Sequence, residues 1–176
     1  MSFMLLGILN AQAAGGGGGA FDLLETTTLT SSASSITFSG IDQSYKHLQI
    51  RSVARGVDGG NIKATFNGDA GSNYAAHGLY GTGSAVASFA SLSRSNVIVA
   101  EAGTNTNVFY ASVTDIVDYS STTKYKTIKG LMGSTLILLR SGVWMNTSAI
   151  TSINLSCQTN DFTAGTRISI YGIKGA

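Results

Sequence analysis

The sequence predicts an all-β fold, an antiparallel β-sandwich of jelly-roll type with about ten strands, preceded by an extended N-terminal arm. From residue 21 onward, apolar and polar side chains alternate with a period of two in short runs, and clusters of Gly, Asn, Asp and Ser separate those runs. Apolar residues at helical spacing persist beyond one turn nowhere except within residues 2–10. Short strands spaced by about 8 to 15 residues are typical of sandwiches and barrels.

The first half of the domain shows its clearest alternation at residues 46–55. There Leu48, Ile50, Ser52 and Ala54 share one face of the expected strand. Strands are also expected at residues 22–30, 35–39, 62–66, 86–92 and 96–100, whereas residues 72–80 are ambiguous.

The second half contains two expected strands with unusually many apolar residues. In residues 108–119, one face carries Phe109, Ala111, Val113 and Val117. Residues 136–145 are apolar on both faces apart from Arg140, Ser141 and Gly142, which predicts a central strand with a bulge or bend at Ser141 and Gly142. The remaining expected strands are residues 125–131, 150–157 and 167–173.

Residues 1–20 differ in composition from the single domain expected at residues 21–176, and we interpret them as an assembly arm. The arm carries a cluster of apolar side chains: Phe3, Met4, Leu5, Leu6, Ile8 and Leu9. Five consecutive glycines follow, expected to act as a hinge: Gly15, Gly16, Gly17, Gly18 and Gly19. Because glycine loses the most conformational freedom on ordering, we expect a neighbouring subunit to hold this arm.

Two targeting interpretations of the N-terminus are disfavoured. The tripeptide Ala11-Gln12-Ala13 resembles a signal-peptide cleavage site, but no Lys or Arg precedes Lys46 to form the basic region of a secretory signal. The apolar run is also much shorter than the roughly 20 residues that span a bilayer, so we expect no membrane partner.

Composition argues against a nucleic-acid partner. Charged residues make up 11% of the chain, well under the usual share of about 25%, and the net charge is +2 with the basic residues scattered. Low charge with 43% hydrophobic residues fits a chain whose surface is partly covered by other chains. It fits equally a compact β-domain with a Ser- and Thr-rich surface.

The sequence offers little material for catalysis. The single cysteine, Cys157, lies in an alternating run and is expected to be a small buried hydrophobic residue. Two isolated histidines, His47 and His77, lack the spacing of a zinc site. Asp115 and Asp118 are three apart on an expected strand, so their side chains should point to opposite faces and cannot form an acid–base pair. We expect no enzymatic activity, no cofactor and no metal.

Two weaker signals have plainer structural interpretations. Residues 67–73 faintly resemble a calcium loop, but they hold one carboxylate and begin with Asn67-Gly68, a pair that favours a hairpin turn. Aromatic residues could also form a sugar-binding platform, although strand packing is the favoured interpretation for each of Tyr74, Tyr80, Tyr110, Tyr119, Tyr125 and Trp144.

Several stretches of the chain resemble small virion proteins of tailed phages. The opening of the domain, residues 21–55, reads FDLLETTTLTSSASSITFSGIDQSYKHLQIRSVAR, and its end, residues 168–176, reads ISIYGIKGA. The segments FNGD, SNYAAHGLYG and DIVDYSSTTKYKTI between them match the same pattern. The resemblance covers most of the chain beyond residue 21, and the motifs that carry it are structural.

The resemblance implies a non-enzymatic virion protein that is assembled in the host cytoplasm. We expect a capsid decoration, or cement, protein, which binds the major capsid protein and further copies of itself as a homotrimer through its arm and inter-subunit β contacts. The alternative is a tail-fibre, baseplate or tail-tip protein, whose partners would be other tail proteins and a host glycan. A glycan hydrolase is a more distant alternative, because it needs convergent carboxylates.

Overall fold

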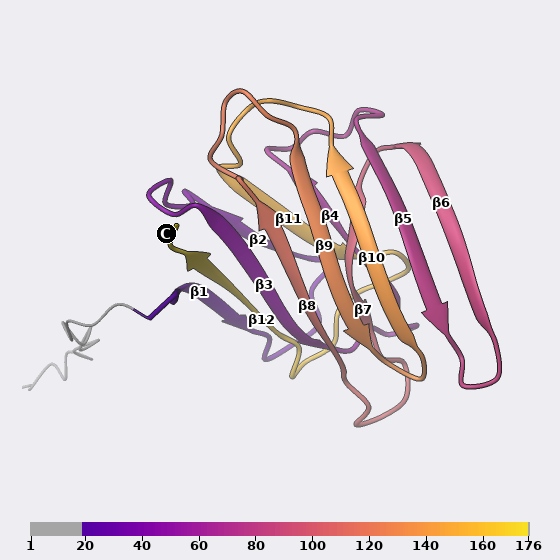
Figure 1. Cartoon of the computed structure of the whole chain (residues 1–176). Coiled ribbons are helices and arrows are strands. Elements are labelled where there is room, and N and C mark those ends of the chain that lie inside the picture. The colour runs from indigo at the N-terminus through magenta and orange to yellow at the C-terminus, as the bar shows by residue number, and fades with distance from the viewer. Residues whose placement is uncertain (1–18, 176) are drawn as a thin grey trace, which may run out of the picture.

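The computed structural model describes residues 19–175, which form an all-β sandwich of two antiparallel sheets (Figure 1). The sandwich predicted from the sequence is therefore confirmed. The strands are β1 (Phe21–Thr28), β2 (Ser35–Ser39), β3 (His47–Ala54), β4 (Gly60–Phe66), β5 (Tyr74–Gly81), β6 (Val86–Arg94), β7 (Val97–Ala102), β8 (Tyr110–Val117), β9 (Lys126–Gly133), β10 (Ile137–Trp144), β11 (Ser152–Cys157) and β12 (Arg167–Ile173).

The two sheets differ in size. The large sheet has eight strands in the order β1-β12-β3-β8-β9-β10-β5-β6, and the small sheet has four in the order β2-β11-β4-β7. The chain passes repeatedly from one sheet to the other, so that β1, β3, β5, β8 and β12 each connect to a strand of the small sheet. Because four strands cannot cover eight, β5 and β6 extend beyond the small sheet at one side (Figure 1).

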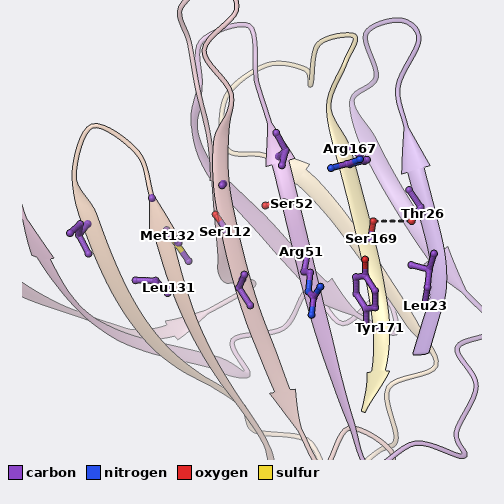
Figure 2. A pocket seen from close by; sticks show the side chains of 15 residues that line it. Leu23, Thr26, Arg51, Ser52, Ser112, Leu131, Met132, Arg167, Ser169 and Tyr171 are labelled. Carbon is purple, nitrogen blue, oxygen red and sulfur yellow. Dashed lines mark hydrogen bonds between the residues drawn. The ribbon is translucent and has the colours of Figure 1, made fainter. Parts of the chain in front are cut away.

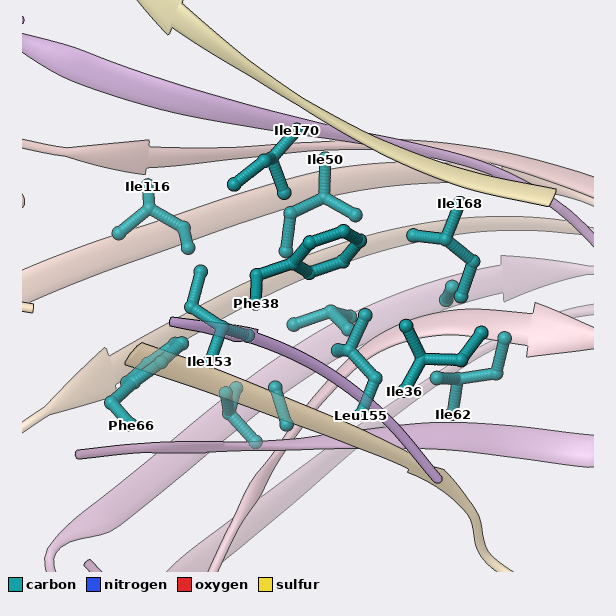
Figure 3. Close-up of a cluster of buried hydrophobic side chains, with 14 of the residues drawn as sticks. Ile36, Phe38, Ile50, Ile62, Phe66, Ile116, Ile153, Leu155, Ile168 and Ile170 are labelled. Carbon is teal, nitrogen blue, oxygen red and sulfur yellow. The ribbon is translucent and has the colours of Figure 1, made fainter. Parts of the chain in front are cut away.

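The core lies between the two sheets. Successive side chains of a strand point to opposite faces, so every second side chain points into this core. Ile50 of β3 faces Phe38 of β2 and Leu155 of β11 (Figure 3). Leu48 of β3 belongs to the same cluster, and all four are at most 2% exposed. The predicted inward set of β3, which also includes Ser52 and Ala54, is buried as expected. At about 25 cal/mol per Å² of apolar area, burial of this kind is the main stabilising term of the fold.

One end of the core is an aromatic cluster closed by a polar turn. Phe66, Tyr74 and Trp144 pack with ring centroids 5.5 to 6.3 Å apart. The turn between β4 and β5 begins with Asn67 and Gly68 at positive φ, as expected of a turn. The expected hairpin is wrong, because β4 and β5 lie in different sheets and do not pair with each other. Asp69 of this turn accepts a hydrogen bond of 2.7 Å from Trp144 Nε1, so the turn seals the aromatic end of the core.

Two sequence-based expectations about strands are corrected. The structure has twelve strands, and the ambiguous residues 72–80 largely form β5. The expected bulge at Ser141 and Gly142 is wrong, because β10 pairs with both neighbours without a shift in register. The glycine serves close packing instead: a Cβ on Gly142 would lie 2.7 Å from the Val97 side chain of the small sheet.

Candidate interaction surface

The outward face of the large sheet carries a row of apolar side chains that no part of residues 19–175 covers. Leu79, Leu139, Leu131 and Val113 are directly opposed in register on the adjacent strands β5, β10, β9 and β8. Their exposed fractions are 51%, 53%, 52% and 43%. Contiguous exposed apolar patches on a folded domain mark protein or ligand contact sites.

A second row runs parallel to the first, nearer the β9–β10 turn. It contains Ile137, Ala111 and Val53, with Gly133 between Ile137 and Ala111. Ile137 is 64% exposed. Neighbouring rows on one face lie two residues apart along each strand, so the two rows form one continuous apolar surface.

The outward face is hollowed along these rows. A groove of about 770 Å³ lies between β1 and β12 on one side and β9 and β10 on the other (Figure 2). A second hollow of about 1000 Å³ continues toward β6 and shares Val113 and Leu131 with the first. The two hollows together cross most of the large sheet, and we call them the outer groove.

Polar side chains border the apolar rows at the β3–β8–β9 junction. Gln49 Nε2 donates to Asp115 at 2.7 Å, and Lys129 Nζ lies 3.4 Å from the same carboxylate. Arg51 Nε donates to Gln49 at 2.7 Å, and its guanidinium lies 4.3 Å from the ring centre of Tyr171. Asp115 and Lys129 are paired with each other. Arg51 ends the first row, because it lies opposite Val113 on β3, and its partners are neutral.

The strand β6 gives the large sheet an unprotected edge. None of its nine residues is buried, and Val86 is 80% exposed. From Val86 to Ser93 it contains no charged residue and no proline, the devices that usually discourage strand addition at an edge. The opposite edge, β1, carries Asp22 and Glu25; both edge strands have one shift in register, and that of β6 is confined to its end between Ser91 and Arg94. The β6 edge is thus the better place for pairing with another strand.

The charged residues weighed for catalysis have structural partners. Asp118, in the turn after β8, lies 2.8 Å from Lys124 Nζ and 3.2 Å from Lys46 Nζ, and the hydrogen bond from Lys124, followed by that from Lys46, lowers the pKa of its carboxyl. His47 Nδ1 accepts the backbone N–H of Asp118 at 2.9 Å. Glu101 lies 3.7 Å from the Arg140 guanidinium between the sheets. Within residues 19–175 no three His, Cys, Asp or Glu side chains converge to hold a metal.

Cys157 and the faint calcium loop also fall into structural roles. Cys157 is buried as predicted, and burial raises the pKa of its thiol to about 11, which keeps it protonated. In the loop, the Asp69 carboxylate accepts hydrogen bonds from Trp144 Nε1, Asn73 Nδ2 and the Gly71 N–H. Asn67 Oδ1 accepts the backbone N–H groups of residues 151 and 152, tying the turn to β11.

The aromatic residues considered for sugar binding do not gather at one site. Tyr74, Tyr119 and Trp144 are at most 1% exposed and belong to the core. Tyr125, by contrast, is 56% exposed at the start of β9. The structure therefore does not bring the aromatic residues together as a sugar-binding platform. The side chains that it brings together on the surface are those of the outward apolar rows.

The predicted arm lies almost wholly outside the described residues. This holds for Phe3, Met4, Leu5, Leu6, Ile8, Leu9, Gly15, Gly16, Gly17 and Gly18, whereas Gly19 begins the described chain. Ala20 then accepts a backbone hydrogen bond from Lys174, next to the start of β1. Any path of the arm therefore starts at the β1 edge of the large sheet.

Sequence reasoning missed the outer groove, although two signals could have revealed it. Residues 136–145 are apolar on both faces, which predicted a central strand; β10 is an interior strand of the large sheet, yet its outward residues Ile137 and Leu139 are exposed. The apolar face expected for residues 108–119 is also the outward one, since Ala111 and Val113 are exposed while Ser112, Thr114 and Ile116 face the core. An apolar face turned away from the core is itself the signature of a contact surface.

No protein-family model, curated protein or solved structure matches the chain. Among residues 19–175, no helix has the length and apolar character needed to cross a bilayer.

Proposed function

We propose that this chain is a non-enzymatic structural subunit of a tailed-phage virion, namely a capsid decoration protein that binds the coat and further copies of itself, as a homotrimer. The observation that carries an assembly role is the half-exposed apolar row Leu79, Leu139, Leu131 and Val113. The assignment to a virion rests on the resemblance of residues 21–55 and 168–176 to small phage virion proteins.

The outward row is suited to contact with protein. Fully burying a leucine or valine is worth about 1.5 to 3 kcal/mol, so covering a half-exposed one contributes roughly 1 kcal/mol. Four such side chains in adjacent positions could supply several kcal/mol before the costs of association are subtracted. The uncharged β6 edge adds a second means of contact, main-chain pairing across subunits.

Labelling of purified particles tests the assignment. An antibody raised against the chain should decorate the capsid shell in electron micrographs, with a copy number comparable to that of the major coat protein. Label confined to the tail would replace the decoration role with a tail-fibre, baseplate or tail-tip role. Absence of the chain from purified particles would refute membership of the virion.

A substitution in the arm tests its part in attachment. Leu5→Asp combined with Leu6→Asp should weaken incorporation into particles and lower the melting temperature far less than a core substitution such as Met132→Ala, because charge there opposes apolar burial on a surface outside the core. Asn10→Asp is the matched control, since it adds charge outside the apolar run. Equal losses of incorporation and of melting temperature would show that the segment belongs to the domain core.

A further inference from the structure

The half of the outer groove next to β1 has the shape of a channel across the strands. Its floor is formed by small or short side chains on β3, β8 and β9, namely Val53, Ala111 and Gly133. Larger side chains stand at the two ends of this floor, with Arg167 of β12 opposite Val53 at one end and Ile137 of β10 opposite Gly133 at the other. Arg51 of β3, opposite Val113 in the neighbouring row, also lines the groove (Figure 2). The channel is therefore open to an extended apolar segment.

The chain contains one segment with matching chemistry, the leader, which we define as residues 3–9 (FMLLGIL). Six of its seven residues are apolar and it carries no charge. Extended, seven residues span about 23 Å, and five strand spacings from β1 to β10 span about 24 Å. The leader thus has the length and the polarity to lie across the channel.

The tether between the leader and the sheet has sufficient reach. Residues 10–19 separate the leader from Ala20, beside the start of β1, and half of them are glycine. Ten residues of a glycine-rich random coil have a root-mean-square span of roughly 17 to 20 Å and a maximum near 36 Å. The distance from β1 to β8, which lies in the middle of the channel, is about 14 Å, or three strand spacings.

This reach favours the chain's own groove over that of another copy. A short flexible tether holds its ligand at an effective concentration in the millimolar range, far above the micromolar concentration of neighbouring subunits in solution. We propose that the half of the outer groove next to β1 is the binding site for the chain's own leader in the isolated subunit. The leader then covers the apolar side chains of that half until assembly, and the second hollow with Leu79 stays open.

The proposal goes beyond the virion assignment and does not depend on it. The sequence alone suggested a neighbouring subunit as the holder of the arm, and the structure adds a holder on the same chain. Particle labelling tests the virion role, whereas the experiment below uses the isolated full-length chain, so either can fail without the other.

Disulfide trapping in the full-length chain tests the site. A cysteine introduced in the leader by Leu5→Cys is paired with Leu131→Cys in the groove or, in a matched control, with Tyr125→Cys. Leu131 lies in β9 and Tyr125 immediately precedes that strand, and they are 52% and 56% exposed. Tyr125 lies nearer the row of paired residues that begins with Phe21. The reach of the tether alone therefore does not favour a disulfide at residue 131 over one at residue 125. The natural Cys157 is buried and does not compete for the leader cysteine.

We expect the intramolecular disulfide to form at least about tenfold faster at Leu131→Cys than at Tyr125→Cys, at low micromolar protein, because seating in the channel raises the local concentration. The product should migrate as a monomer on denaturing gels. Equal rates at the two positions would overturn the proposal, and so would products that are mainly covalent dimers.

A second pair of variants separates apolar seating from chance contact. Adding Ile137→Asp, which places a charge in the channel opposite Gly133, should reduce the rate ratio to about one. Adding Thr127→Asp, on the exposed side of β9 outside the groove, should leave the ratio unchanged. A preference that survives Ile137→Asp in a chain of unchanged melting temperature would overturn the proposal.

Discussion

Asp69 should be one of the most sensitive polar positions in the domain. Its carboxylate accepts the Nε1–H of Trp144, which is 1% exposed, and also the Gly71 N–H at 2.9 Å and Asn73 Nδ2 at 3.0 Å. Asp69→Ala leaves the buried indole N–H without this partner, at a cost of about 1 to 3 kcal/mol, and removes turn bonds worth roughly 0.5 kcal/mol each. We expect the free energy of unfolding to fall by about 2 to 4 kcal/mol.

Urea unfolding followed by intrinsic fluorescence measures this effect, since Trp144 is the only tryptophan of the chain. Asp42→Ala is the matched control, because Asp42 Oδ1 accepts one exposed turn bond from the Ser44 N–H. The control should cost less than about 1 kcal/mol. Asp69→Asn keeps one acceptor oxygen, so its loss of unfolding free energy should lie between those of Asp69→Ala and Asp42→Ala. Equal losses for Asp69→Ala and Asp42→Ala would refute the reasoning.

The same contacts set a pH dependence. The bond from Trp144, followed by those from Asn73 and Gly71, lowers the pKa of Asp69 below its ordinary value of 3.8. A carboxyl with a lowered folded-state pKa contributes stability above its unfolded pKa and loses it as the pH falls through the folded value. The difference in unfolding free energy between the natural chain and Asp69→Ala should therefore shrink below about pH 4. A difference that stays constant into stronger acid would contradict this cause.

Three further outcomes follow from the core. Met132→Ala, at a fully buried position of β9, should lower the free energy of unfolding by about 2 to 4 kcal/mol in urea titrations. Burial raises the pKa of Tyr74 and of Tyr119 to about 12, against 10 in the unfolded chain, so melting temperature should be independent of these groups below pH 10 and fall as the pH rises toward 12. Gly172→Ala places a Cβ against the Tyr45 ring and should cost about 1 to 3 kcal/mol in thermal unfolding.

The strands themselves could be predicted well because alternation and turn residues are local signals. The expected strands at residues 35–39 and 167–173 coincide with β2 and β12. The ambiguous stretch, β5, contains Gly78 opposite Phe89, whose ring occupies the space above the glycine, so its alternation of side chains is incomplete. Glycine in a strand weakens the pattern by which strands are recognised.

The pairing of distant strands and the outer groove could not be predicted. The paired strands β1 and β12 lie at opposite ends of the domain's sequence, and no local property of Phe21–Thr28 specifies Arg167–Ile173 as its partner. The groove depends on that order, because Val113 and Leu131 meet only when β8 and β9 pair. A period-two pattern also distinguishes the two faces of a strand without saying which of two apolar faces is buried.

The central claim is that protein covers the outward face of the large sheet in the assembled particle. Maleimide labelling of a Leu79→Cys variant tests it most directly, since Leu79 is 51% exposed in the second hollow of the outer groove. The thiol should react readily in particles that have been dissociated and should be protected in intact ones. Equal reactivity in intact and dissociated particles would contradict the account.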